Sequence, residues 1–509
     1  MELVAADAAR LTPARLALLP AAVARPRYDR SALRVGIVHL GLGAFARAHL
    51  AAVNDAALHA GADLAWGICG VSLRQADTRD ALAPQAGLYT LALRSADAAG
   101  REQQQATVIG CMLEMLVAPE DPQAVLARIA HADTRIVSVT VTEKGYCHDP
   151  ASGRLNLQHP DIVHDLAQPL LPRSTIGFLV WGLQQRRAAG RGPITLMSLD
   201  NLPSNGHLLR GMVLAFARQV DPALATWIET LCAFPCSMVD RIVPRTTDSD
   251  RRDVAQALGM DDAWPVLGEP YLEWVVEDQF AAGRPDWTAG GARFVDEAAP
   301  FETLKLRTVN GAHSALAYLS VMAGWATVDE AMAQPALKAY LAALMQDEIV
   351  PTLPPLPGLD LARYQQRLLK RFENPALKHQ TRQIAMDGSQ KLPQRLLDTV
   401  RARLAADLPI GKLALAVAAW LHFLRGVDEA GLRYDIQDPM AAELAHCYAQ
   451  AERAAECSGT GQTAMLAWTE TLTGLAAVFG DLGADPRFVR AVSQAAHALR
   501  SQGVSGALA

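Results

Sequence analysis

The chain has 509 residues, of which 50% are hydrophobic and 20% are charged, and its formal net charge is −6. This length exceeds what one ordinary hydrophobic core supports, so we expect two or more domains. The small negative charge gives no electrostatic reason to bind nucleic acid or an anionic membrane surface.

Neither a membrane protein nor a metalloprotein is expected. Apolar runs stop well short of the roughly 18 residues of a transmembrane helix, and the acidic start, residues 1–7, does not look like a signal peptide. Seven scattered cysteines suggest a reducing compartment. The nearest pair, Cys232 and Cys236, lacks further ligands at metal-binding spacing. We therefore expect a cytoplasmic protein without a metal.

A glycine turn follows the first predicted strand. Residues 33–40 are mostly apolar and form a plausible buried strand, and residues 41–53 begin Gly-Leu-Gly and continue as a predicted helix. Strand, turn and helix in this order are the context that a dinucleotide-binding fingerprint needs, although an ordinary strand-to-helix turn is the alternative. Ala46 takes the place of the third glycine. The predicted cofactor contacts in this turn are Gly41, Gly43, Ala44 and Phe45.

The choice between NAD and NADP depends on the end of the second predicted strand. This strand spans residues 64–73, and Asp77 comes shortly after it. An acid here binds the ribose 2′-hydroxyl and excludes a 2′-phosphate, so NAD is expected. Arg74 is the alternative, because its guanidinium suits a 2′-phosphate.

Two further predicted strands end in polar clusters. Residues 134–142 run into Glu143, and residues 193–199 run into the segment 200–206. Strand ends of a parallel sheet face the ligand crevice, although a helix cap with a turn would also explain the second cluster. Alternation of strands and helices predicts a doubly wound, Rossmann-type α/β domain over residues 1–296.

From residue 297 the sequence changes to long Ala- and Leu-rich amphipathic segments. The predicted helices span residues 312–346, 360–372, 390–405, 411–425, 437–454, 461–479 and 486–502. We therefore expect a second, all-α domain over residues 297–509.

Three polar side chains stand in the helix predicted to open this domain, within residues 301–314. Lys305 and His313 are about 80° apart on a regular helix, and Asn310 is three residues from His313. A lysine in an apolar cleft has a lowered pKa and can accept a proton, while an amide and an imidazole can hold the oxygen that it serves. The alternative is a solvated lysine with capping side chains.

A polar stretch, residues 378–395, interrupts the helical pattern with four cations and several amides. It suits the rim of a site that recognises a hydroxyl-rich or anionic small molecule, or else a solvated loop.

Five motifs in this order resemble the polyol-specific long-chain dehydrogenase/reductase family, also called the mannitol dehydrogenase family, over nearly the whole chain. They lie at residues 41–49, 142–146, 200–206, 238–242 and 305–313. Ala46 is a departure, because many relatives have histidine there.

The resemblance implies hydride transfer between NAD(P) and a secondary alcohol of a sugar alcohol or sugar acid, without a metal. The family's catalytic lysine corresponds to Lys305, and its oxyanion-holding asparagines correspond to Asn201 and Asn310. Its substrate-binding histidine corresponds to His313, and its gating glutamate corresponds to Glu302. A cofactor contact corresponds to Glu143, and substrate contacts correspond to Asp240 and Lys391.

Within the family, the chain looks more like fructuronate reductases than mannitol 2-dehydrogenases. Gln383 replaces an arginine typical of the mannitol branch, and Arg382, Lys391 and Arg395 are candidate partners for a carboxylate. Gln383, Lys391 and Arg395 are therefore expected to bind substrate. The expected reaction is NAD-dependent interconversion of D-mannonate and D-fructuronate by a monomer or small homo-oligomer. The alternatives are a mannitol 2-dehydrogenase, a D-arabinitol dehydrogenase, or a dinucleotide sensor without catalysis.

Overall fold

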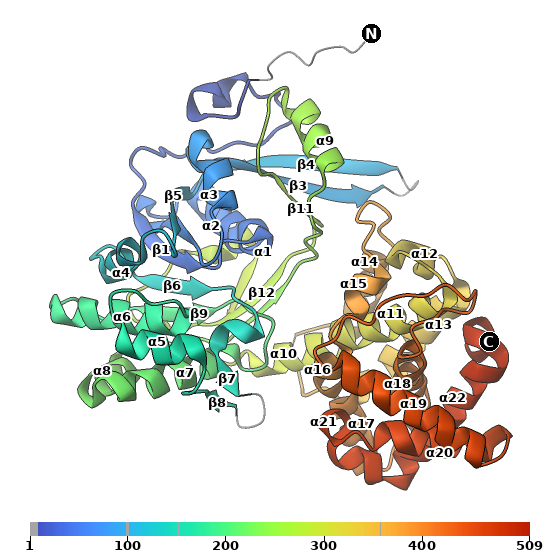
Figure 1. Ribbon diagram of the computed structural model, residues 1–509. Coiled ribbons are helices and arrows are strands. Elements are labelled where there is room, and N and C mark those ends of the chain that lie inside the picture. The colour runs from blue at the N-terminus through green and yellow to red at the C-terminus, as the bar shows by residue number, and fades with distance from the viewer. Residues whose placement is uncertain (1–8, 98–100, 150–152, 357) are drawn as a thin grey trace. The chain divides into compact units, whose positions relative to one another are not determined.

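The computed structural model describes residues 9–97, 101–149, 153–356 and 358–509. It contains two compact units, one of residues up to 97 together with 102–302, and one of residues 303–509 together with 101. The first is coloured blue to yellow-green and the second yellow to red in Figure 1. The division between these units falls between residues 302 and 303, within α10 (Ala299–Lys305). The domain boundary expected from the sequence, between residues 296 and 297, stays a prediction.

A five-stranded parallel sheet forms the centre of the first unit. Its strand order is β5-β2-β1-β6-β9, and every residue of β1, β2, β6 and β9 is buried. The strands are β1 (Val35–Leu40), β2 (Gly67–Ser72), β5 (Met112–Val117), β6 (Ile136–Val139) and β9 (Thr195–Ser198). Continuous apolar runs of this kind are typical of a parallel sheet that is covered on both faces.

Helices pack against both faces of this sheet. Val38 and Leu40 of β1 lie in a core with α4 (Pro122–Ala130), α6 (Thr175–Ala188) and α7 (Asn205–Val220). Ile37 of β1 lies in a second core with α2 (Leu50–His59). The remaining helices of this unit are α1 (Ala44–Ala48), α3 (Asp77–Leu82), α5 (Pro160–Ala167), α8 (Pro222–Leu231) and α9 (Asp248–Leu258). The predicted doubly wound α/β fold is confirmed.

Several predicted strands are shorter than expected. Residues 64–66 form a 3-10 turn capped by Asp63, whose side chain accepts from the Ala65 amide, so β2 begins only at Gly67. The predicted strand 134–142 is reduced to β6, and 193–199 is reduced to β9. The helix predicted after the glycine turn is interrupted at His49, whose φ and ψ are −113° and −83°.

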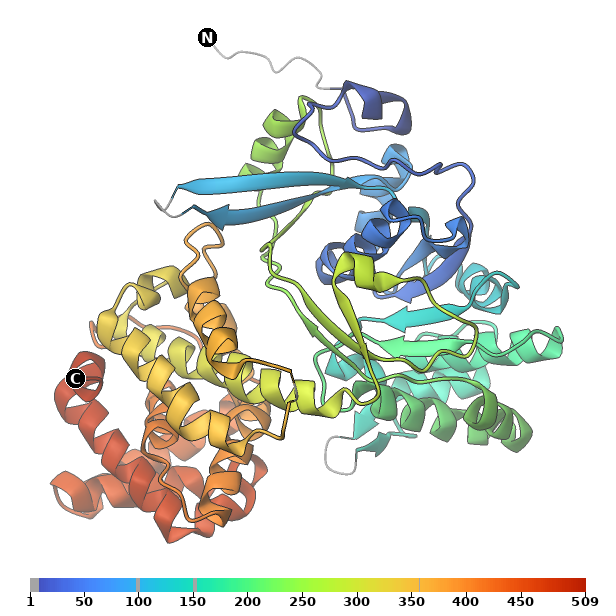
Figure 2. The same ribbon diagram turned by 180° about the vertical axis from the view of Figure 1, so that it is seen from behind.

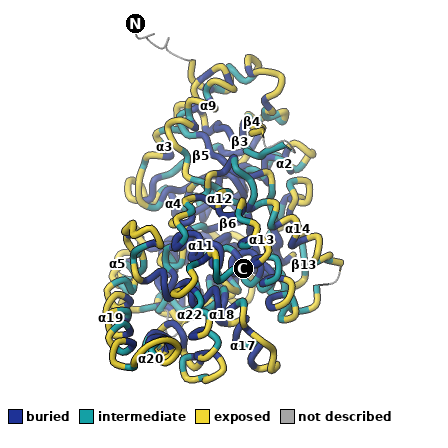
Figure 3. Tube along the Cα trace, turned by 90° about the vertical axis from the view of Figure 1, so that its right-hand side faces the viewer, coloured by how far each residue is buried: buried dark blue, intermediate teal, exposed yellow. Residues whose placement is uncertain are grey.

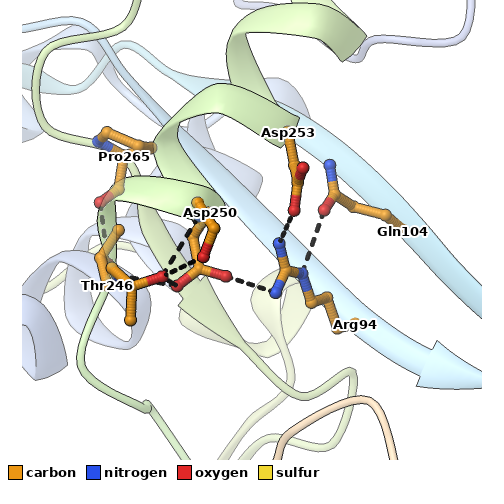
Figure 4. Close-up of polar contacts among 8 residues, drawn as sticks. Arg94, Gln104, Thr246, Asp250, Asp253 and Pro265 are labelled. Carbon is orange, nitrogen blue, oxygen red and sulfur yellow. Dashed lines mark hydrogen bonds and ion pairs between the residues drawn. The ribbon is translucent and has the colours of Figure 1, made fainter.

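A long antiparallel hairpin, which the sequence pattern does not predict, pairs β3 (Tyr89–Ala96) with β4 (Glu102–Ile109), as Figure 2 shows. Arg94 of β3 donates to Asp250 at 2.5 Å and to Asp253 at 3.2 Å, both on α9 (Figure 4). Asp250 also completes the capping box at the start of α9. One guanidinium therefore ties the hairpin to the end of a helix.

Smaller sheets complete the first unit. The parallel strand β11 (Val266–Gly268) joins β3, and β7 (His148–Asp149) pairs with β8 (Arg154–Leu155). A third sheet has the order β10-β12-β13 and consists of β10 (Ser237–Asp240), β12 (Glu273–Glu277) and β13 (Ala292–Val295).

The second unit is helical in all its named elements, and two central helices form its core. α11 (Gly311–Ala323) and α18 (Gly411–Phe423) are largely buried, as their dark blue tubes in Figure 3 show. The other helices are α12 (Val328–Met332), α13 (Pro335–Ala343), α14 (Leu361–Phe372), α15 (Thr381–Ala385), α16 (Gly388–Leu392), α17 (Asp398–Ala405), α19 (Ala441–Cys457), α20 (Gly461–Thr473), α21 (Ala476–Phe479) and α22 (Pro486–Ala507). Across the described ranges, none of the helices has both the length and the apolar character needed to cross a membrane.

The prediction of one helix over residues 312–346 is wrong. α11 ends at Gly324, whose φ of 80° is left-handed, and α12, α13 and a π-helical turn at Leu344–Ile349 follow. Glycine adopts this conformation without steric cost and commonly ends helices. The predicted helix 390–405 likewise consists of α16, a π-helical turn at Pro393–Leu397 and α17.

Candidate active site

A cleft of about 830 Å³ opens in the first unit where β1, β2 and β6 end. Its walls are the glycine turn after β1, the segment after β2, the segment after β6 and the start of α6. In open α/β sheets, ligands bind beyond the carboxyl ends of the strands, so this is the expected position for a dinucleotide.

The two glycines of the turn serve different purposes. Gly41 has φ +95°, and a Cβ added there would lie 2.1 Å from the Thr140 carbonyl oxygen. Gly43 has φ −103°, and the nearest heavy atom to an added Cβ, the Gly41 carbonyl oxygen, is 3.9 Å away. Gly41 is therefore required by the fold, whereas Gly43 leaves open space beside the backbone. This space fits the close approach of a pyrophosphate group.

A buried histidine in β1 supports the glycine turn. The two ring nitrogens of His39 lie 2.8 Å from Ser138 Oγ and 2.9 Å from Thr140 Oγ1. Burial lowers the pKa of His39 to about 4, so the ring is neutral. The Thr140 hydroxyl donates to the Gly41 carbonyl oxygen at 2.8 Å, so it accepts from Nε2–H of His39. The imidazole thereby fixes the hydroxyl that orients the turn.

Asp200, which follows β9, binds the segment after β6 that lines the cleft. Its carboxylate accepts from the amides of Val141 at 3.0 Å and Thr142 at 2.9 Å and from the Tyr146 hydroxyl at 2.8 Å. Thr142 has φ +63°, which is rare for a β-branched residue. Burial raises the pKa of Asp200, and these hydrogen bonds oppose that rise. Sequence reasoning singled out the segment 200–206 but missed this role of Asp200.

The structure places both candidates for selecting the cofactor at the cleft. Asp77 is the first residue of α3, and its carboxylate accepts from the Thr78 amide at 2.9 Å. Asp77 and Arg74 both line the cleft.

The other predicted cofactor contacts differ in their surroundings. Ala44 begins α1, and the Phe45 ring stacks on His49 with centroids 5.0 Å apart. Glu143 lies 3.7 Å from His148 Nε2, whereas its neighbours Lys144 and Gly145 line the cleft.

The segment after β9 connects two more predicted site residues. Asn201 is exposed, and Ser204, which has φ +47°, donates its amide to Glu302 Oε2 at 2.8 Å. The other carboxylate oxygen of Glu302 is buried and has no hydrogen-bond partner in the described part of the chain. Burial raises the pKa of Glu302. Asp240, the last residue of β10, is only 7% exposed.

In the second unit, a π-helical turn follows Lys305. Lys305 ends α10 with 6% of its surface exposed, and Leu306–Asn310 form the π turn before α11. Each residue of a π turn rotates less about the helix axis than an α-helical residue, because the hydrogen bonds run from i to i+5. Asn310 and His313 therefore lie closer to the side of Lys305 than the 80° expected for His313 on a regular helix. π turns inside helices are frequent at functional sites.

Two polar atoms, one at the end of this turn and one shortly after it, are buried and have no partner among the described residues. Asn310 Nδ2 and His313 Nε2 make no hydrogen bond to any described residue. The His313 ring stacks on Phe372 with centroids 4.8 Å apart. Burial lowers the pKa of His313 well below its ordinary value, and electrostatic interactions with the neighbouring His379 and with the cations Arg395, Arg371 and Lys391 add to this effect. The ring is therefore neutral, and its surroundings are cationic.

Lys391 and Arg395, two predicted substrate contacts, belong to these surroundings. Arg395 donates to Ser314 Oγ at 3.2 Å, and burial lowers its pKa. Burial, with a contribution from Arg395, lowers the pKa of Lys391 to about 8. The Lys391 amine lies 3.9 Å from the Asp387 carboxylate. The third predicted contact, Gln383, is exposed and lines a pocket of about 300 Å³ together with Arg382 and Tyr434.

Both halves of the sequence match one enzyme family. Residues 35–289 match the mannitol dehydrogenase Rossmann domain, and residues 297–500 match the mannitol dehydrogenase C-terminal domain. The chain belongs to the mannitol dehydrogenase family. The expected family and enzyme class are therefore confirmed.

Relatives in this family include two kinds of named enzyme. D-mannonate oxidoreductase of Escherichia coli (strain K12) is 44% identical over 94% of this chain and 96% of that protein. Mannitol 2-dehydrogenase of Phaeosphaeria nodorum is 40% identical over 95% and 82%. The structure of Pseudomonas fluorescens mannitol 2-dehydrogenase, a ternary complex with NAD and D-mannitol, is 38% identical, covers 98% of both chains and has a TM-score of 0.86.

Proposed function

We propose that this protein is an NAD-dependent dehydrogenase that interconverts D-mannonate and D-fructuronate. The observation that supports a carboxylated substrate is the set of charged side chains around His313. Besides burial and the neighbouring imidazole of His379, the groups that lower its pKa are Arg395, Arg371 and Lys391, and all three are cations at neutral pH. A carboxylated substrate in a buried site needs such partners, because an unpaired buried anion is costly.

The chemistry of the cleft in the first unit suits NAD. The glycine turn leaves room for the pyrophosphate, and Asp77 is positioned along the same cleft to bind a ribose hydroxyl. NAD supplies the hydride acceptor for oxidation of the alcohol.

Proton transfer is assigned to Lys305. Its amine donates a proton to the substrate oxygen when the ketone is reduced, and accepts that proton when the alcohol is oxidised. Asn310 Nδ2, which lacks a partner among the described residues, is available to donate to the same oxygen as charge develops there. Asn201 is proposed as a further donor to this oxygen, His313 as a substrate contact, and Glu302 as the gating carboxylate.

A mannitol 2-dehydrogenase activity is the second candidate. Two observations favour it, namely the similarity to the Pseudomonas fluorescens enzyme and the proximity of Asp387 to Lys391, which offsets part of the cationic charge. D-arabinitol is tested alongside mannitol as another neutral polyol.

Substrate preference tests the proposal directly. Initial rates with D-mannonate, D-mannitol and D-arabinitol are compared at one NAD concentration, and D-mannonate is expected to have the highest kcat/KM. Higher kcat/KM for a neutral polyol would select the second candidate. Dinucleotide binding without turnover of any of the three would instead indicate a sensor.

Removing one buried positive charge tests whether Arg395 is responsible for a preference for the carboxylated substrate. Arg395→Met removes the buried guanidinium and should lower kcat/KM for D-mannonate about ten-fold more than for D-mannitol. Arg490→Met, which changes an exposed residue of α22, is the matched control and should leave both values unchanged. Equal losses on the two substrates with Arg395→Met would contradict a role in carboxylate binding.

A further inference from the structure

A second imidazole lies beside His313. The rings of His379 and His313 meet edge to face, with centroids 5.3 Å apart and planes at 64°. Phe372 covers the face of His313 with its own ring at 4.8 Å. His379 precedes α15 and lies in the polar stretch 378–395, but the sequence gives it no role of its own.

The backbone around His379 is held in an unusual conformation. Lys378 has φ +46°, a region that residues other than glycine rarely adopt. Its amine lies 2.9 Å from Asp329, and the His379 carbonyl oxygen accepts from the Val328 amide at 3.0 Å. The neighbouring Gln380 forms a β-bridge with Thr327. Strain that several contacts maintain in this way is common at ligand sites.

Each of the two rings has one buried nitrogen that makes no hydrogen bond within the described ranges, Nδ1 in His379 and Nε2 in His313. Buried polar groups are nearly always satisfied, so two such atoms on touching rings indicate a bound partner. The pKa of His379 is lowered to about 4 by burial, and that of His313 falls well below its ordinary value. Both rings are therefore neutral at physiological pH.

A neutral imidazole offers one donor and one acceptor, and a hydroxyl group offers both as well. A hydroxyl can thus satisfy either nitrogen in either tautomer, whereas a carboxylate can only accept. The chemistry of the ring pair consequently suits hydroxyl groups, while Arg395 and Lys391 suit a carboxylate.

We propose that His379 is a second substrate-binding imidazole, which together with His313 binds hydroxyl groups on adjacent carbons of the substrate. This inference rests on the proposed polyol or sugar-acid dehydrogenase activity. It assigns recognition of the hydroxylated part of the substrate to a residue pair, and it makes His379 a determinant of which sugar configurations react.

Amide replacements distinguish hydrogen bonding from packing. An asparagine amide reaches the position of a histidine Nδ1, whereas a glutamine amide reaches the position of Nε2. Because the buried nitrogen of His379 is Nδ1, His379→Asn should retain kcat/KM within about three-fold of the wild type, while His379→Ala and His379→Gln should lose about ten-fold or more. At His313 the order is reversed, and His313→Gln should retain more activity than His313→Asn.

The experiment measures kcat/KM on the preferred substrate, the dissociation constant for NADH by fluorescence, and the thermal midpoint Tm. NADH affinity should be the same in all variants, and His446→Ala, an exposed change on α19, should resemble the wild type in every readout. A deoxy analogue that lacks the bound hydroxyl should be turned over equally by the wild type and His379→Ala.

Three results have distinct meanings. A wild-type protein that turns over no polyol or sugar acid overturns the proposed function itself. An active wild type with unchanged kcat/KM in His379→Ala overturns this inference alone. Equal losses in the alanine, asparagine and glutamine variants would also overturn it, because they would show that the ring acts only by packing.

Discussion

The cleft of the first unit and the surroundings of His313 in the second unit differ in whether their buried polar groups are hydrogen-bonded within the protein. In the cleft, His39, Thr140 and Asp200 are hydrogen-bonded to neighbouring protein groups. Around His313, nitrogens of Asn310, His313 and His379 have no partner among the described residues. The first region is complete before a ligand binds, whereas the second has hydrogen-bonding capacity left for one.

This difference indicates what each region recognises. The cleft presents backbone around two glycines, which suits the invariant phosphate part of a dinucleotide. The second region presents side chains, which differ easily between relatives and can read the configuration of hydroxyl groups. We therefore expect substitutions in the second region to change substrate choice and substitutions in the cleft to change cofactor affinity.

The largest effect is expected for Lys305→Ala, which should lower kcat by about 10²- to 10⁴-fold because the proton donor and acceptor is lost. The dissociation constant for NADH should stay within about two-fold, since the cleft is untouched. Steady-state kinetics and NADH fluorescence measure the two quantities. Lys338→Ala, which removes an exposed amine paired with Glu373, is the control and should be near normal. A wild-type kcat in Lys305→Ala would remove the mechanism.

Gly43→Ala tests the other side of the comparison. An added Cβ meets no close neighbour, and φ of −103° suits alanine, so Tm should not change. The methyl group would occupy the space assigned to the pyrophosphate, and NADH affinity should fall about ten-fold or more. Gly192→Ala, also in open space, is the control. Unchanged NADH affinity in Gly43→Ala would show that the dinucleotide lies elsewhere.

The smallest effect is a pH dependence from Lys391, whose pKa is lowered to about 8 by burial. The amine is charged below this pH and neutral above it, so kcat/KM for a carboxylated substrate should fall about ten-fold as pH rises from 7 to 9. In Lys391→Arg the charge persists, and this part of the decline should disappear. If wild type and Lys391→Arg decline alike, the titrating group is a residue other than Lys391.

Strand ends and turns that are marked by glycines and apolar runs could be predicted from the sequence. The strand ending at Leu40, the glycine turn and the polar ends of the later strands were predicted because glycine and apolar runs carry strong local signals. The hairpin was missed because β4 begins with the exposed residues Glu102–Gln105, which look like a solvated loop. The hydrophobic pattern alone does not reveal that β4 is a strand paired with β3, the strand that precedes it in the sequence.

The candidate site was predicted less completely than the fold. Lys305, Asn310 and His313 were found because they share one helix, so their spacing is visible. Asp200 and His379 were missed because their roles depend on contacts with residues 58 and 66 positions away, Thr142 and His313. The π turn was also not predicted, because an i to i+5 hydrogen bond does not change the pattern of apolar residues in the sequence.

The π turn at Leu306–Asn310 has a consequence for how this chain can vary. Because the π turn accommodates about one residue more than a regular helix does over the same rotation, removing a single amino acid there would let the helix become regular while the later side chains of α11 keep nearly their present direction. Single-residue exchanges in the turn preserve its length and do not have this effect. Homologous chains should therefore have either the present number of residues in this stretch or one residue fewer, with the side chains of α11 facing the same way in both.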